Sequence, residues 1–192
     1  MKTKLKTLLT VSIMALIVVI STISNAASVG MTLSSNSKLK AGDTVTVTMS
    51  LGNIDAGNGI DTITAELNYD KNVFETVETS NLIASNSWTP TYASSTNMLT
   101  AVKNSKVTKG ETVLTITLKV KSTLSVKSTT VTLKDIVVSG GRVQDGGTGD
   151  INVNNASVTI NADSDAINKN ENTTGNTTTT TNTTTNTTKQ NA

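Results

Sequence analysis

A hydrophobic period of two, repeated along the middle of the chain, constrains the fold more than any other feature. In the segments 44–51, 62–69 and 114–121, apolar residues alternate strictly with Thr or other polar residues. Successive side chains of a β-strand point to opposite faces of its sheet, so each segment predicts a strand with one buried and one solvated face. The many β-branched Thr residues on the polar side favour the same conformation.

Shorter runs of the same kind bring the expected number of strands to about nine; they lie at 29–33, 73–78, 88–93, 98–103, 129–138 and 151–160. Sequences rich in Gly, Asp and Asn separate these runs and predict turns, as at 57–59 and 146–150. No segment after the first 26 residues repeats with a helical period. We therefore expect an all-β chain folded as a jelly-roll β-sandwich, with an aliphatic core that includes Phe74.

Residues 1–26 have the organisation of a secretory signal peptide. A lysine-rich start precedes an apolar stretch from about residue 8 to residue 23, and Ser24-Asn25-Ala26 offers small residues for cleavage. The stretch is shorter than the roughly 20 apolar residues that span a bilayer, so we expect cleavage after Ala26 and no membrane span in the mature chain. The absence of Cys favours a bacterial exterior of Gram-positive type, and we expect a secreted or cell-surface protein.

Residues 163–192 consist almost entirely of Thr, Asn, Ser, Lys and acidic residues. Such a segment has too little apolar surface to offset the entropy lost on ordering, so it predicts a disordered linker or stalk. The expected organisation is therefore a signal peptide at 1–26, a β-sandwich domain at 27–162 and a Thr/Asn-rich tail at 163–192.

The composition excludes most catalytic chemistry. The chain contains no His and no Cys, which excludes Ser-His-Asp and Cys-His nucleophiles, the usual zinc and haem ligands and disulfide bonds. Without the leader it carries 13 basic and 14 acidic residues, and Arg142 is its only Arg. Phosphate recognition needs clustered Lys and Arg, so nucleic-acid binding is not expected. We expect a non-enzymatic protein without a cofactor.

Two groups of acidic residues partly resemble known sites, one a calcium-binding loop and the other a pair of glycosidase carboxylates, but neither group matches its site fully. Asp150, Asn152 and Asn154 occupy positions 1, 3 and 5 of a calcium loop, but the loop lacks its Gly and its final Glu and alternates as a strand does. Asp61 and Glu66 have opposite strand parity, so they would not face each other as the carboxylates of a glycosidase do. Neither a metal site nor a catalytic site is therefore expected.

Four stretches, in order and with matching spacing, resemble the cohesin family. The resemblance covers residues 29–162 and is carried by 41–47 (AGDTVTV), 59–75 (above all ELNYDKNVFE at its end), 112–121 (TVLTITLKVK) and 156–160 (ASVTI). It implies a nine-stranded jelly-roll sandwich that binds dockerins, the calcium-loaded modules of plant-cell-wall enzymes, and so assembles polysaccharide-degrading complexes. In the family, recognition uses one face of the sheet that contains the third, fifth, sixth and eighth strands.

The resemblance also implies partner-binding residues. Aligning on Tyr69-Asp70 places the polar contact positions of the third strand at Thr62 and Thr64, and strand parity adds Glu66. The corresponding positions of the fifth and sixth strands are Thr91, Thr100 and Val102. The sequence departs from the family in having Lys71 where Pro is usual. The predicted face is also dominated by Thr and lacks the aromatic and Arg side chains that usually anchor a partner.

Two other functions remain open at this stage. Trp88 and Tyr92 share strand parity and, if exposed, would form a flat platform for stacking on a polysaccharide, as in carbohydrate-binding modules of the same sandwich class; partial burial under a loop is the alternative. Pro90 between them indicates an edge strand. The third reading is a structural surface-stalk or adhesin-like domain, in which the sandwich is displayed on its tail.

Overall fold

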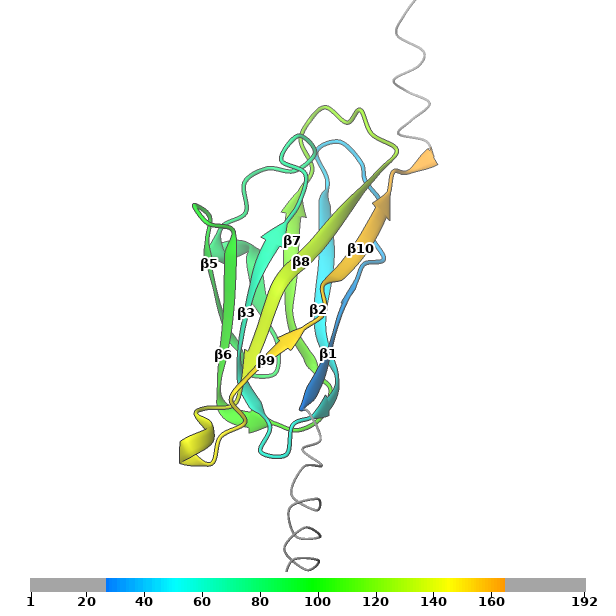
Figure 1. The fold of residues 1–192 in the computed structure, drawn as a ribbon. Helices are drawn as coiled ribbons and strands as arrows, with labels where there is room; N and C mark the ends of the chain where they lie inside the picture. Colours follow the sequence, from blue (N-terminus) through cyan, green and yellow to red (C-terminus); the bar gives the residue numbers. More distant parts are fainter. Residues whose placement is uncertain (1–26, 165–192) are drawn as a thin grey trace, which may run out of the picture.

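The computed structural model describes residues 27–164 as two antiparallel β-sheets packed face to face (Figure 1). The predicted signal peptide and all of the predicted tail beyond residue 164 lie outside the described residues. The first and last described residues lie at opposite ends of the sandwich (Figure 1). Within 27–164 no helix is long and apolar enough to span a membrane.

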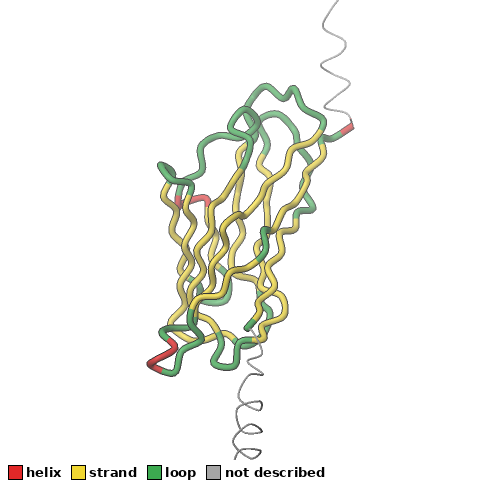
Figure 2. The backbone as a smooth tube through the Cα atoms, viewed as in Figure 1, coloured by secondary structure: helices red, strands yellow, loops and turns green. Residues whose placement is uncertain are grey.

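The smaller sheet has the strand order β1-β2-β7-β4 and the larger one the order β10-β8-β3-β6-β5, with β9 pairing alongside β8. The strands are β1 (Ser28–Ser34), β2 (Thr44–Asp55), β3 (Ile60–Asn68), β4 (Leu82–Ala84), β5 (Thr89–Ala93), β6 (Met98–Val107), β7 (Thr112–Lys119), β8 (Ser128–Ser139), β9 (Asp150–Val153) and β10 (Ala156–Asn161). Two single-turn 3-10 helices, η1 (Thr79–Asn81) and η2 (Val143–Asp145), lie in loops; strands make up most of the remaining fold (Figure 2).

The all-β sandwich is confirmed, with ten strands in place of about nine. Residues 73–78 do not form a strand, because Val73 and Phe74 are both buried and their amides bond to the carbonyl of Asp70 in a turn. Only a single bridge joins Phe74 to Val120. The predicted strand at 151–160 is two strands, β9 and β10, and the short strand β4 was not predicted.

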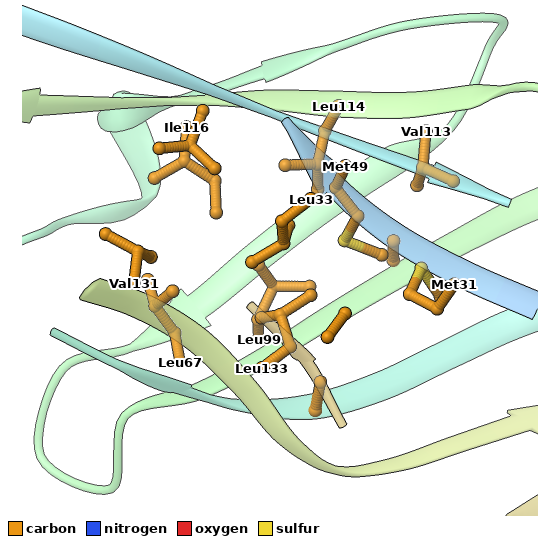
Figure 3. Close-up of a cluster of buried hydrophobic side chains, with 14 of the residues drawn as sticks. Met31, Leu33, Met49, Leu67, Leu99, Val113, Leu114, Ile116, Val131 and Leu133 are labelled. Carbon is orange, nitrogen blue, oxygen red and sulfur yellow. The ribbon is translucent and has the colours of Figure 1, made fainter. Parts of the chain in front are cut away.

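The period of two buries one face of each strand. In β2 and β3 the alternating apolar residues are almost fully inaccessible, and the Thr residues between them face outward. Met49, Leu99, Leu114, Ile116 and Leu133 from both sheets meet in the core (Figure 3). Phe74 is 1% exposed, as expected, and packs edge to face against Tyr69. Removing this apolar surface from water stabilises the sandwich, at about 25 cal/mol per Å².

Candidate partner-binding face

The residues predicted to bind a partner lie together on the outer side of three neighbouring strands, β3, β6 and β5. Thr62 pairs with Val102, and Val102 pairs on its other side with Thr89. In the next row Thr64 pairs with Thr100, and Thr100 pairs with Thr91. Side chains directly opposite each other in antiparallel strands lie within about 4.5–5.5 Å at Cβ, so these rows form a continuous surface.

A third row continues the surface at Glu66, which pairs with Met98 on β6 and with Lys134 on β8. On the β8 side, Thr64 pairs with Val137 and Thr62 with Ser139. We call this surface the recognition face; it comprises Thr62, Thr64, Glu66, Thr89, Thr91, Met98, Thr100, Val102, Lys134, Val137 and Ser139. All six predicted partner-binding residues belong to it, and their role in binding stays a prediction.

The recognition face is weakly charged and partly apolar. Among the described residues only four large hydrophobic side chains are exposed, and two of them, Met98 (36%) and Val102 (42%), lie on this face. Val137 is half-buried beside Thr64. The opposite charges of Glu66 and Lys134 lie in one cross-strand pair, and like all such pairs they offset each other.

Met98 and Val137 were missed at the level of the sequence. Met98 begins the predicted run 98–103 and has the same strand parity as Thr100 and Val102, so applying that parity to the whole run would have found it. Val137 follows a bulge at Asp135, whose φ of 47° interrupts the alternation of β8. Parity counted from the start of β8 therefore assigns Val137 to the wrong face.

Trp88 and Tyr92 are buried, with 2% and 8% of their surfaces exposed. They therefore do not present the open, flat platform that sugar stacking requires. The indole Nε1 of Trp88 donates to Oε1 of Glu111 at 2.7 Å, and Nζ of Lys103 reaches the same oxygen at 2.7 Å. The Lys103 ammonium also lies 5.8 Å from the centre of the indole ring. These contacts join β6 to the start of β7 and explain the burial of Trp88.

Tyr92 is held by polar groups on both sides of the edge strand β5. Its hydroxyl donates to Oδ1 of Asn97 at 3.2 Å, and its amide donates to Oγ1 of Thr79 at 3.0 Å. Burial, and secondarily the neighbouring Tyr69, raises the pKa of the Tyr92 hydroxyl. With Pro90 unable to donate a backbone hydrogen bond, the free edge of β5 is poorly suited to pairing with another strand.

The acidic residues considered at the sequence level have structural partners or stand apart. Asp61 forms an ion pair with Lys106 at 3.3 Å, and Oδ1 of Asp70 accepts from the amide of Asn72 at 2.8 Å within its own turn. Asp150 begins β9, as the strand interpretation of the calcium-like pattern predicts. No group of three or more acidic residues that could hold a metal ion occurs within 27–164.

Comparison with known proteins identifies the family of this chain and solved structures of similar fold. The family model of the cohesin domain matches residues 29–162. A solved cohesin module from a family 33 glycoside hydrolase of Clostridium perfringens ATCC13124 has a TM-score of 0.59 and 10% sequence identity, covering 71% of this chain and 98% of that module. At this identity the likeness concerns the fold. No curated protein sequence matches the chain.

Proposed function

Since this chain belongs to the cohesin domain family, we propose that it is a non-catalytic module that binds a dockerin-type protein through the recognition face. One observation carries the proposal: the positions that the family resemblance assigns to recognition form one unbroken surface of three paired strands. Residues scattered over both sheets would have argued against it.

The chemistry of the recognition face suits a protein surface. Thr hydroxyls donate and accept hydrogen bonds, while their methyl groups, together with Met98 and Val102, offer apolar contact. Thr62, Thr64 and Thr100 project from paired strands and have few rotamers to lose, so binding on this face costs little conformational entropy. A face with almost no net charge favours a partner whose contact surface is itself mainly apolar or hydroxylated.

The biological setting belongs to the same proposal. The signal peptide predicted at 1–26 supports export, and the predicted tail supports a spacer that holds the module away from its attachment. A secreted or cell-surface module with a single docking face would recruit dockerin-bearing enzymes into polysaccharide-degrading complexes. The burial of Trp88 and Tyr92 favours this function over direct polysaccharide binding by these two rings.

Capture from the secreted proteins of the source organism tests the proposal. The chain from Ala27 onward is immobilised, and captured proteins are identified by mass spectrometry. We expect dockerin-bearing proteins, released by a calcium chelator because dockerins are loaded with calcium. Capture that survives the chelator, or retention of the chain on insoluble polysaccharide without any protein partner, would overturn the proposed function.

A further inference from the structure

The loop between β8 and β9, residues 140–149, forms a hollow at one end of the recognition face. The loop projects beyond the sheet at the lower left of Figure 1. Together with the adjoining strand ends it forms a shallow, open hollow of about 400 Å³, lined in part by Ser139, Arg142, Val143 and Asp150. None of these residues has a role in the proposed docking, apart from Ser139 as a member of the recognition face.

The hollow continues the recognition face without a break. Asp150 pairs with Ser139, Ser139 with Thr62, and Thr62 with Val102, so one row of side chains runs from the hollow to the centre of the face. A protein docked over Thr62 and Val102 therefore lies beside the hollow, and a side chain at its edge can enter.

The loop is rigidly held despite its many glycines. Asn58 Nδ2 donates to the carbonyl of Gly146 at 2.5 Å, and Thr148 Oγ1 donates to the carbonyl of Gly59 at 2.6 Å. Lys106 Nζ donates to the carbonyl of Gly140. A Cβ on Gly140 would collide with the carbonyl oxygen of Gly59, so the loop and the β2–β3 turn pack backbone against backbone. A hollow fixed in this way costs little to order when a ligand enters.

Two unpaired charges of opposite sign line the hollow. Arg142 and Asp150 are exposed, and within 27–164 neither side chain has an ion-pair or hydrogen-bond partner. A carboxylate entering the hollow would gain from Arg142 but be repelled by Asp150, and an ammonium group would meet the reverse. A neutral group that both donates and accepts hydrogen bonds satisfies both charges.

We propose that the hollow receives one uncharged polar side chain of the docked partner, a carboxamide or a hydroxyl, and that Arg142 and Asp150 together select it. This inference rests on the proposed function, since the partner must first dock on the recognition face. Arg142 would then be the Arg anchor that the strands of the recognition face lack, and it lies on a rigid loop at the rim of that face.

Two charge-neutralising substitutions test the selection by the direction in which each changes the dissociation constant. Arg142→Gln and Asp150→Asn are made separately in the chain from Ala27 onward, and the dissociation constant is measured with the dockerin-bearing protein captured above. If the entering group is neutral and bonds to both, each substitution weakens binding by about tenfold, because each removes a charge-assisted hydrogen bond. If it is a carboxylate, Asp150→Asn strengthens binding; if it is an ammonium group, Arg142→Gln does. The inference is overturned if one substitution weakens binding while the other strengthens it, or if neither substitution changes the dissociation constant.

Matched controls separate this result from other causes. Lys109→Gln and Asp55→Asn change the same charges on exposed residues at the same end of the sandwich, outside the hollow, and should leave the dissociation constant unchanged. Thermal unfolding of all four variants should match that of the wild-type chain. Binding that is lost on altering Thr64 but unaffected by Arg142→Gln and Asp150→Asn would leave the docking function standing and refute the selection. If no dockerin-bearing protein binds at all, both proposals fail.

Discussion

Thr64 and Thr100 lie directly opposite each other in the antiparallel ladder of β3 and β6, at the middle of the recognition face. Val137 flanks the pair on the β8 side and Thr91 on the β5 side. The cross-strand neighbours of Thr64 and Thr100 in this row are therefore small and uncharged. A partner that covers this row meets only short, branched side chains with little freedom to adjust, so its shape must match the sheet closely here.

Replacing Thr64 with Arg should abolish docking without unfolding the sandwich. The long charged side chain would stand in the centre of the interface and hold the partner off, which should weaken binding by at least about 30-fold. The dissociation constant for the captured dockerin-bearing protein gives the measurement. Thr48→Arg is the matched control: Thr48 is equally half-buried, on the outer side of the other sheet. Equal losses in both variants would exclude the recognition face as the docking site.

Truncating the exposed apolar residues of the same face should have a smaller, graded effect. Val102→Ala and Met98→Ala each remove apolar surface that a partner would cover, so each should weaken binding by about three- to tenfold. Ile83 offers a control, because it is 55% exposed but lies on β4 of the other sheet. Ile83→Ala should leave the dissociation constant unchanged. A loss with Ile83→Ala comparable to that with Val102→Ala would move the interface to the other sheet.

The sequence was informative wherever one rule, strand alternation, decided the outcome. It identified β2, β3 and β7 and the outward direction of Thr62, Thr64 and Thr100, because these strands keep their parity over most of their length. It misread 73–78, where consecutive buried residues follow a turn, and it did not reveal Val137, which lies beyond a bulge.

The hollow beside β9 was beyond sequence-level reasoning for a different reason. Its walls come from contacts between segments far apart in the chain, such as Asn58 with Gly146 and Lys106 with Gly140. A glycine-rich run such as 146–150 predicts only a turn from local rules. The buried position of Trp88 depends likewise on a long-range contact, its hydrogen bond to Glu111.

Removing the carboxylate of Glu111 should destabilise the sandwich. The side chains of Lys103 and Glu111 are only 13% and 24% exposed, so Glu111→Ala removes the carboxylate that both a poorly hydrated ammonium group and the indole Nε1 of Trp88 bond to. We expect the free energy of unfolding to fall by about 2–3 kcal/mol. Urea denaturation followed by the fluorescence of Trp88, the only Trp in the chain, measures this directly.

The exposed ion pair of Lys40 and Asp43 provides the contrast. Its side chains are 62% and 55% exposed and their charged atoms lie 3.8 Å apart. Solvent screens such a pair, so Asp43→Asn should change the free energy of unfolding by no more than about 0.5 kcal/mol. If Asp43→Asn and Glu111→Ala lowered the free energy of unfolding by similar amounts, the Lys103–Glu111 contact would contribute no more stability than an exposed ion pair.

Gly140→Ala should destabilise the protein far more than Gly57→Ala. A Cβ at Gly140 would collide with the carbonyl oxygen of Gly59, and neither backbone can move without breaking the bonds that tie the loop to the β2–β3 turn. We expect a loss of about 2–3 kcal/mol in the free energy of unfolding. At Gly57 nothing lies within 4 Å of the added Cβ, so that variant should be neutral or slightly stabilised. Equal stabilities would mean that the loop is not packed against the turn.

The stability of the sandwich should fall as the pH rises above about 10, and Tyr92 should account for part of the fall. Burial raises the pKa of the Tyr92 hydroxyl in the folded state, whereas the unfolded chain ionises near the ordinary value of 10.0. Above that pH the folded state holds more protons than the unfolded one, so the free energy of unfolding decreases with pH. Tyr92→Phe cannot ionise and should show a shallower decrease. It should be about 1 kcal/mol less stable at neutral pH, because it loses the hydrogen bond to Asn97. Urea denaturation of both proteins between pH 7 and about pH 11 gives the two slopes, and parallel curves would exclude Tyr92 as a source of the alkaline sensitivity.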